Sequence, residues 1–171
     1  IKAIQWLACE MVALRGHSSV DGKFMSLYKL LAEFDPAAKA YLDHLDQIRS
    51  NPTRRKPAVN VLSPRNVRRL LNVMKTKTVE SIVNRMKLSG VCSIINDGTQ
   101  DMSKLEASCL LLRYVEESKS GRRQPVERLV GLFTTGSTSG DTLRDKIIEH
   151  LNDINVPTVH IIGQSYDGAG N

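Results

Sequence analysis

The spacing of apolar residues changes near Gly90, and this change limits the possible fold more than any other feature of the sequence. Before Gly90, apolar residues recur every three or four positions, as in amphipathic helices. After it they alternate or form short continuous runs, as in strands. The sequence therefore predicts helices first and a sheet second. A length of 171 residues suits one domain, or one domain with an appendage.

Three short helices are predicted at about residues 1–14, 23–34 and 36–48. The third has the clearest start, because Asp35 is a typical N-cap residue and Pro36 suits the first helical position.

A longer helix is predicted to begin at Ser63 and Pro64, which repeat this start signal, and to run to about Leu88. Gly90 follows as a C-terminal stop. Residues 50–62, just before this helix, contain two prolines and three consecutive basic residues, so we expect a linker there.

Four strands and one helix are predicted in the C-terminal part. The strands cover about residues 91–96, 107–116, 126–134 and 157–163, and the helix between the last two is capped by Thr138 or Ser139. A polar turn at 118–124 joins the second and third strands as a hairpin. The expected organisation is a helical region, 1–88, followed by a β-β-β-α-β mixed sheet, 89–171, in the α/β class.

A helical crossover makes the fourth strand parallel to a strand already in the sheet. If it lies beside the first strand, Asp97 and Asp167 meet at the carboxyl edge, where α/β sheets carry their sites. Two close carboxylates repel unless one is protonated or a cation binds. Oxygen ligands suit Mg²⁺ or Mn²⁺, which support phosphodiester cleavage. The alternative is that both aspartates are ordinary turn or cap residues.

Basic residues are concentrated between Arg49 and Lys87, where 11 of them accompany a single acidic residue, Glu80. The whole chain carries only +6, so the remainder is net negative. We expect nucleic acid as a partner of this region. The candidate contacts to DNA phosphates are Arg54, Arg55, Lys56, Arg65, Arg68 and Arg69. The alternative is a solvated helix face with a nuclear-import-like patch.

Three cysteines without a close pair argue against a disulfide framework and a cysteine-based zinc site. The chain has no apolar run of membrane-spanning length, so no membrane partner is expected. It begins at Ile1 with a segment unlike a secretory signal, and we interpret it as an internal fragment.

Three ordered segments resemble a known family. Val91 to Val115 is similar to the first catalytic strand and the second strand of hAT-superfamily transposases, in particular the transposase-derived family found with TTF-type, THAP or MYM-type zinc fingers. Residues 164–171, QSYDGAGN, resemble that family's Gln-Gly-Tyr-Asp-Gly-Ala motif. Residues 14–17, LRGH, and 30–36, LLAEFDP, resemble its Arg-Gly-His and Leu-Leu-Ala-Glu-His-Asp-Pro segments.

The resemblance implies a truncated ribonuclease H-like fold in which Asp97 and Asp167 match the first two acids of a DDE triad that binds Mg or Mn. The third acid is expected downstream, so this fragment alone should be inactive and hold no cofactor tightly. Gly98 and Ser165 depart from the family's usual Glu and Gly.

Two functions follow from the resemblance for the intact parent. One is metal-dependent cleavage and strand transfer of DNA, in the nucleus, with self-association through the missing C-terminal region. The other is a catalytically inactive DNA-binding or protein-interaction module of a transcription or chromatin regulator.

Overall fold

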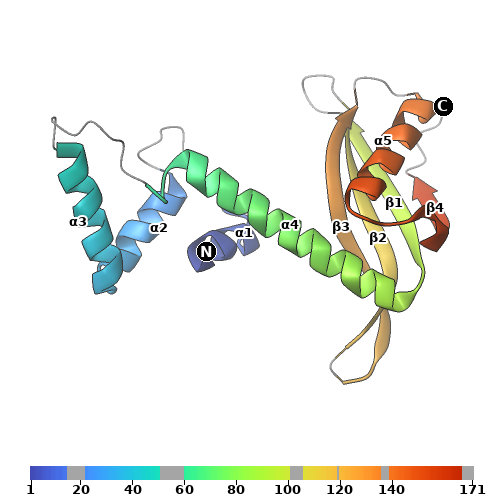
Figure 1. The fold of residues 1–171 in the computed structure, drawn as a ribbon, viewed down its shortest axis with the longest axis horizontal. Coiled ribbons are helices and arrows are strands. Elements are labelled where there is room, and N and C mark those ends of the chain that lie inside the picture. Colours follow the sequence, from blue (N-terminus) through green and yellow to red (C-terminus); the bar gives the residue numbers. More distant parts are fainter. Residues whose placement is uncertain (15–21, 51–59, 101–105, 119, 136–138, 167–171) are drawn as a thin grey trace. The chain divides into compact units, whose positions relative to one another are not determined.

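The computed structural model describes residues 1–14, 22–50, 60–100, 106–118, 120–135 and 139–166. Four helices come first: α1 (Lys2–Cys9), α2 (Lys23–Ala32), α3 (Pro36–Ser50) and α4 (Pro64–Ser89). They are followed by β1 (Cys92–Gln100), β2 (Glu106–Glu117), β3 (Arg123–Thr135), α5 (Gly140–Asp153), the 3₁₀ turn η1 (Thr158–His160) and β4 (Ile161–Tyr166) (Figure 1). This order confirms the predicted α/β class, a helical region followed by a β-β-β-α-β sheet.

The chain divides into two compact units, Ile1–Met74 and Lys75–Asn171. The division falls inside α4, so this helix contributes to both hydrophobic cores. Its first part packs with α1, α2 and α3 around buried residues Ile4, Leu7, Phe24, Leu45, Leu62 and Val67. Its second part packs on the sheet. The domain boundary predicted near residue 88 stays a prediction.

The helix starts predicted from the sequence are confirmed by capping hydrogen bonds. Asp35 Oδ1 accepts from the Ala37 N–H at 2.9 Å, and Ser63 Oγ accepts from the Asn66 N–H at 3.3 Å. Ser139, not Thr138, caps α5. Each cap satisfies a backbone donor that has no partner within its helix.

The first helix is shorter than predicted, because it ends at Cys9. Met11 adopts a left-handed conformation, φ 54°, and the Val12 N–H returns to the Leu7 carbonyl at 2.8 Å. This is a Schellman ending, normally built on glycine. The helical spacing of apolar residues continues beyond the end of α1 because Val12 still packs on the same hydrophobic core.

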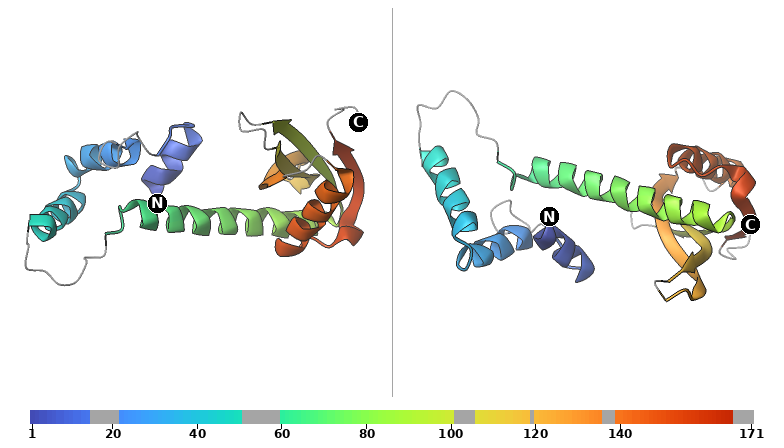
Figure 2. Two further views of the ribbon diagram at one scale, coloured as in Figure 1. Left: turned by 90° about the horizontal axis from the view of Figure 1, so that it is seen from above. Right: turned by 60° about the horizontal axis from the view of Figure 1, so that its bottom comes forward.

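The four strands form one sheet in the order β3-β2-β1-β4 (Figures 1 and 2). β1 and β2 are antiparallel, as are β2 and β3, and the hairpin between them was predicted. β4 lies beside β1 and runs parallel to it, as a helical crossover requires. The condition set in the sequence analysis, that the fourth strand lies beside the first, is therefore met.

One face of the sheet carries the hydrophobic core. Alternate residues of the central strands, including Ile94, Leu110 and Leu112, are buried against Met86 of α4 and Leu151 of α5. On the opposite face, which we call the open face, no described helix of the unit Lys75–Asn171 packs. Leu129 and Leu132 lie on it and are 49% and 71% exposed.

A β-bulge in β3 brings α5 close to the sheet. The register between β2 and β3 shifts at Leu110/Leu111, and the extra residue, Val130, is buried. The next residue, Gly131, lies under His150 of α5, whose Nε2 is 3.0 Å from the Val130 carbonyl oxygen. A Cβ on Gly131 would lie 2.5 Å from that nitrogen, so only glycine fits without displacing His150.

The fourth strand begins later than predicted. Residues 158–160 form a 3₁₀ turn, in which the His160 N–H donates to the Pro157 carbonyl at 3.1 Å, and pairing with β1 starts only at Ile161. The strand then extends through Tyr166. Residues with high β-propensity occupy the turn, which explains why the sequence pattern placed the strand too early.

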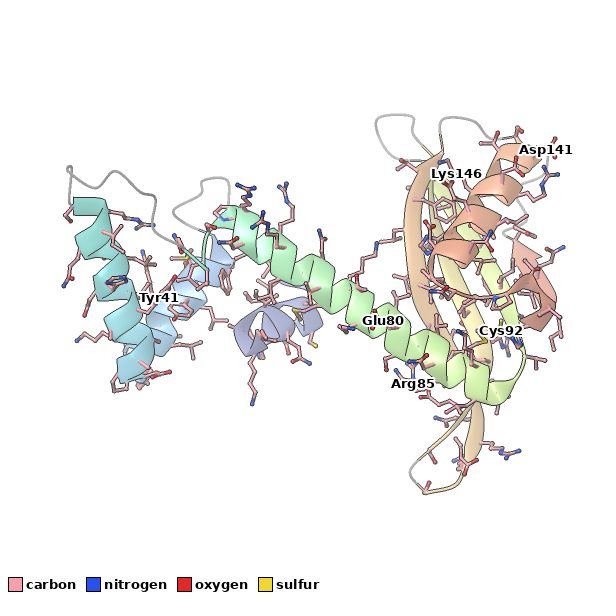
Figure 3. The ribbon with its side chains drawn as sticks, viewed as in Figure 1. Tyr41, Glu80, Arg85, Cys92, Asp141 and Lys146 are labelled. Atoms are coloured by element: carbon pink, nitrogen blue, oxygen red, sulfur yellow. The ribbon has the colours of Figure 1, made fainter. Side chains whose placement is uncertain are left out.

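An ionic cluster connects α4 to the β2–β3 hairpin, and its member on α4, Arg85, is labelled in Figure 3. Glu116 accepts from Arg85 Nη1 at 2.7 Å and from Arg128 Nη2 at 3.0 Å. Its side chain is 19% exposed, less than either partner. The hydrogen bonds from Arg128 and then Arg85 hold the pKa of Glu116 below its usual value.

We expect Leu110→Ala to destabilise the sheet unit by about 2–5 kcal/mol, because Leu110 is completely buried and the change leaves a cavity. Leu132→Ala, on the open face of the neighbouring strand, is the control and should change stability by about 0.5 kcal/mol or less. Urea unfolding followed by circular dichroism measures both. Equal losses of stability in the two variants would contradict the assignment of Leu110 to the core face and Leu132 to the open face.

The Glu116 cluster predicts a specific acid sensitivity. Because the folded-state pKa is lowered, the contribution of Glu116 is complete above the unfolded value of about 4.3 and disappears as the pH falls through the folded value. The stability difference between wild type and Glu116→Gln should therefore be largest near neutral pH and narrow below about pH 4.3.

Glu117→Gln serves as the matched control, since the ion pair of Glu117 with Arg123 is well exposed and contributes little. Urea unfolding between pH 3 and 7 tests the difference. If the difference in free energy of unfolding between wild type and Glu116→Gln stays constant over this pH range, the prediction is refuted.

Candidate functional site

The candidate site lies where β1 and β4 run side by side in the same direction. Their register ends with Asn96 opposite Tyr166. The residues that follow these two in the sequence are Asp97 and Asp167. Asp97 is described and exposed, whereas Asp167 lies outside the described residues. The distance between the two carboxylates is accordingly an open prediction.

Asp97 belongs to β1 and does not follow its end, which differs from the sequence expectation. β1 continues through Gly98 to Gln100 because its backbone pairs with β2, and Asp97 lies opposite Cys109. Pairing to a neighbouring strand thus overrides the turn preference of Asn-Asp-Gly. The backbone hydrogen bonds between β1 and β2 fix the backbone of Asp97 more firmly than a loop would.

Asn96 and Asp97 point to opposite faces of the sheet, as neighbours in a strand do. Asn96 is 3% exposed and lies on the core face, where its Oδ1 has no hydrogen-bond partner among the described residues. Asp97 lies on the open face and makes no hydrogen bond or ion pair with another described residue. A carboxylate that is solvent-accessible and unpaired is free to accept a cation.

The described residues provide only part of a metal site. Asp97 offers the oxygen donor that Mg²⁺ or Mn²⁺ prefers, while its cross-strand neighbour Cys109 offers a soft thiol that suits neither. Within the described ranges, no group of three or more His, Cys, Asp and Glu side chains is placed to hold a metal ion. The residue types fit the first ligand of a two-metal site, and further ligands must come from elsewhere.

Gly163 allows β4 to approach β1 closely, a role that we did not assign to it from the sequence. Gly163 lies opposite Ser93, and a Cβ at this position would be 2.9 Å from Ser93 Oγ. A side chain at position 163, three residues before Tyr166, would therefore require the Ser93 hydroxyl to move. Glycine within a strand is the sequence signal for such an approach.

Only three of the six candidate phosphate contacts lie among the described residues. Arg65, Arg68 and Arg69 are exposed on the first turns of α4 and form no ion pair with described residues. Farther along the same helix, Lys77 pairs with Glu80 at 2.6 Å and Arg85 pairs with Glu116, while Lys75 and Lys87 form no ion pair with described residues.

Arg54, Arg55 and Lys56 lie outside the described residues. The described helices include none that is both long enough and apolar enough to cross a membrane. Among the described residues, the basic side chains of α4 without an ion pair are thus Arg65, Arg68 and Arg69 in its first turns and Lys75 and Lys87 farther along.

A family model described as "ZMYM1/FAM200, RNase-like domain" covers residues 1–171, and no curated protein matches the chain. The match spans both units and agrees with the truncated ribonuclease H-like fold that the resemblance implied. The chain belongs to the ZMYM1/FAM200 RNase-like domain family.

Proposed function

We propose that this domain derives from a hAT-type transposase and that its parent protein cleaves and transfers DNA strands with Mg²⁺ or Mn²⁺. Asp97 and Asp167 are the residues that would hold the metal, together with a third acid expected outside these 171 residues. The metal would supply an activated oxygen nucleophile and stabilise the leaving oxygen. DNA as substrate places the parent protein in the nucleus.

The register of β1 and β4 carries this proposal. Parallel strands end at the same edge of a sheet, and the last described pair, Asn96–Tyr166, immediately precedes both aspartates in the sequence. Asp97 is also exposed and free of a described partner, whereas a structural cap residue would accept a hydrogen bond from the backbone. These two observations favour the metal-ligand role of Asp97 over the turn role.

In the intact parent protein, we expect Asp97→Asn or Asp167→Asn to lower DNA cleavage by roughly 100-fold or more, since a metal supplies several kcal/mol of transition-state stabilisation. Asp153→Asn is the control, because Asp153 is exposed on α5 and away from this sheet edge. Cleavage assays with a labelled duplex measure the effect. Unchanged cleavage by either variant would overturn the metal assignment.

Mn²⁺ binding by the intact parent protein gives a second readout that needs no catalysis. We expect wild type to reduce the electron paramagnetic resonance signal of free Mn²⁺ more than either variant does, while Asp153→Asn behaves as wild type. Equal Mn²⁺ binding by all four proteins would count against the site.

The second candidate function is a catalytically inactive DNA-binding module. It is favoured by Arg65, Arg68 and Arg69, which have no acidic partner among the described residues. Basic side chains that neutralise phosphates release counterions, so binding by such a surface weakens as salt rises. This function needs no metal and therefore survives in EDTA.

We expect the triple change of Arg65, Arg68 and Arg69 to Gln to reduce the salt slope of duplex binding by about 3 units, at ~0.9 per phosphate contact. Lys2, Lys29 and Lys39 changed together to Gln form the control, which removes the same charge from exposed positions of other helices. Fluorescence anisotropy in EDTA gives the slopes. Identical slopes for both triple variants would show that α4 makes no specific contribution.

A further inference from the structure

The β2–β3 hairpin extends beyond the sheet as a two-stranded ribbon. The last residue of β2 that pairs with β1 is Arg113, but pairing with β3 continues for four more residues, through Glu117–Arg123. We call this part, the described residues 114–118 and 120–126, the ribbon. It projects past the end of α4 in both figures that show the fold (Figures 1 and 2).

The tip of the ribbon is held by its own hydrogen bonds. The Ser118 N–H donates to the Arg122 carbonyl at 2.8 Å, and the Gly121 N–H donates to the Ser118 carbonyl at 2.9 Å. Ser118 Oγ also accepts from the Arg122 N–H at 3.1 Å. Gly121 supplies the positive φ, 78°, that closes the turn. The tip is therefore preorganised, which lowers the entropy cost of binding through it.

The base and the tip of the ribbon differ in how their arginines are paired. At the base, Arg85 and Arg128 both pair with the single carboxylate of Glu116. At the tip, Arg122 has no acidic partner among the described residues, and Arg123 pairs with Glu117 only at 3.3 Å, with side chains that are 77% and 56% exposed. Residues 118–126 contain no acidic residue. The tip consequently presents positive charge that the fold does not neutralise.

We propose that the tip of this ribbon binds the phosphate backbone of double-stranded nucleic acid through Arg122 and Arg123. A two-stranded ribbon has the width that the major groove accepts, and arginine forms bidentate contacts with phosphate. An acidic protein surface or a lipid headgroup would suit the positive charge equally. Neither of them requires a narrow, projecting tip with few apolar residues, whereas a groove of a duplex does. The proposal rests on the proposed DNA-directed function and adds a contact to it.

This contact is remote from the aspartate edge. Asp97 lies opposite Cys109, and Ser118 is nine residues further along the chain from Cys109, which corresponds to about 30 Å at ~3.3 Å per residue. The tip and Asp97 therefore occupy opposite ends of the sheet. Binding through the tip should need no metal and should be unaffected by Asp97→Asn.

The test is duplex binding by the 171-residue chain in EDTA, measured by fluorescence anisotropy with a DNA of about 25 base pairs between about 50 and 200 mM salt. The variant Arg122→Gln/Arg123→Gln keeps Ser118 and Gly121 and hence the turn. Because this variant cannot neutralise two of the phosphates, its salt slope should fall by about 2 units, so the affinity advantage of wild type should shrink by roughly tenfold over this range. Its far-ultraviolet circular dichroism should match wild type.

Lys29→Gln/Lys39→Gln removes the same charge from exposed positions of α2 and α3 and should keep the wild-type slope. A tip variant with the wild-type slope, or a control whose slope falls as much, would overturn the ribbon contact alone. No duplex binding by wild type would overturn the DNA-directed function as well. Binding of wild type to phosphatidylserine vesicles, but not to DNA, would assign the tip to a membrane surface and overturn the proposal.

Discussion

Backbone pairing between β1 and β4 is the interaction on which the candidate site depends. It joins segments about 70 residues apart in the chain, from Cys92–Ile161 to Asn96–Tyr166. The connection runs through α5, which is followed by a left-handed Asn155, φ 59°, so that Val156 turns back into the core. His160 Nδ1 then lies 2.7 Å from the Gly90 carbonyl oxygen, which ties the start of β4 to the end of α4.

Much of the fold was predictable because its signals are local. An N-cap side chain, a proline at the first helical position and the period of apolar residues each depend on a few neighbouring residues, and the caps at Asp35 and Ser63 were placed correctly. The errors occur where distant contacts override local preference. β1 runs through Asn-Asp-Gly because β2 pairs with it, and Met11 accepts a conformation usual for glycine because Val12 packs on the helical core.

The candidate site was predictable only in part. The sequence pattern identified Asp97 and the parallel arrangement, since a helical crossover constrains strand direction. Outside the candidate site, it did not identify the cluster of Glu116, Arg85 and Arg128, because the two arginines are 31 and 12 residues away from Glu116 and such distant pairs leave no periodic signal. Nor did it show that Asn96, next to the candidate ligand, would be buried with an oxygen that no described residue pairs. Burial of that amide follows from the strand alternation, but its unpaired state does not.

The contact between Gly131 and His150 has an evolutionary consequence. The imidazole of residue 150 occupies the space above residue 131, and it reaches the Val130 carbonyl only because residue 131 lacks a Cβ. Residue 131 cannot gain a side chain while residue 150 keeps its imidazole in this place. Relatives with a larger residue at position 131 should therefore carry a smaller or displaced side chain at position 150. This pair is a natural marker for aligning the third strand and the crossover helix among distant members of the family.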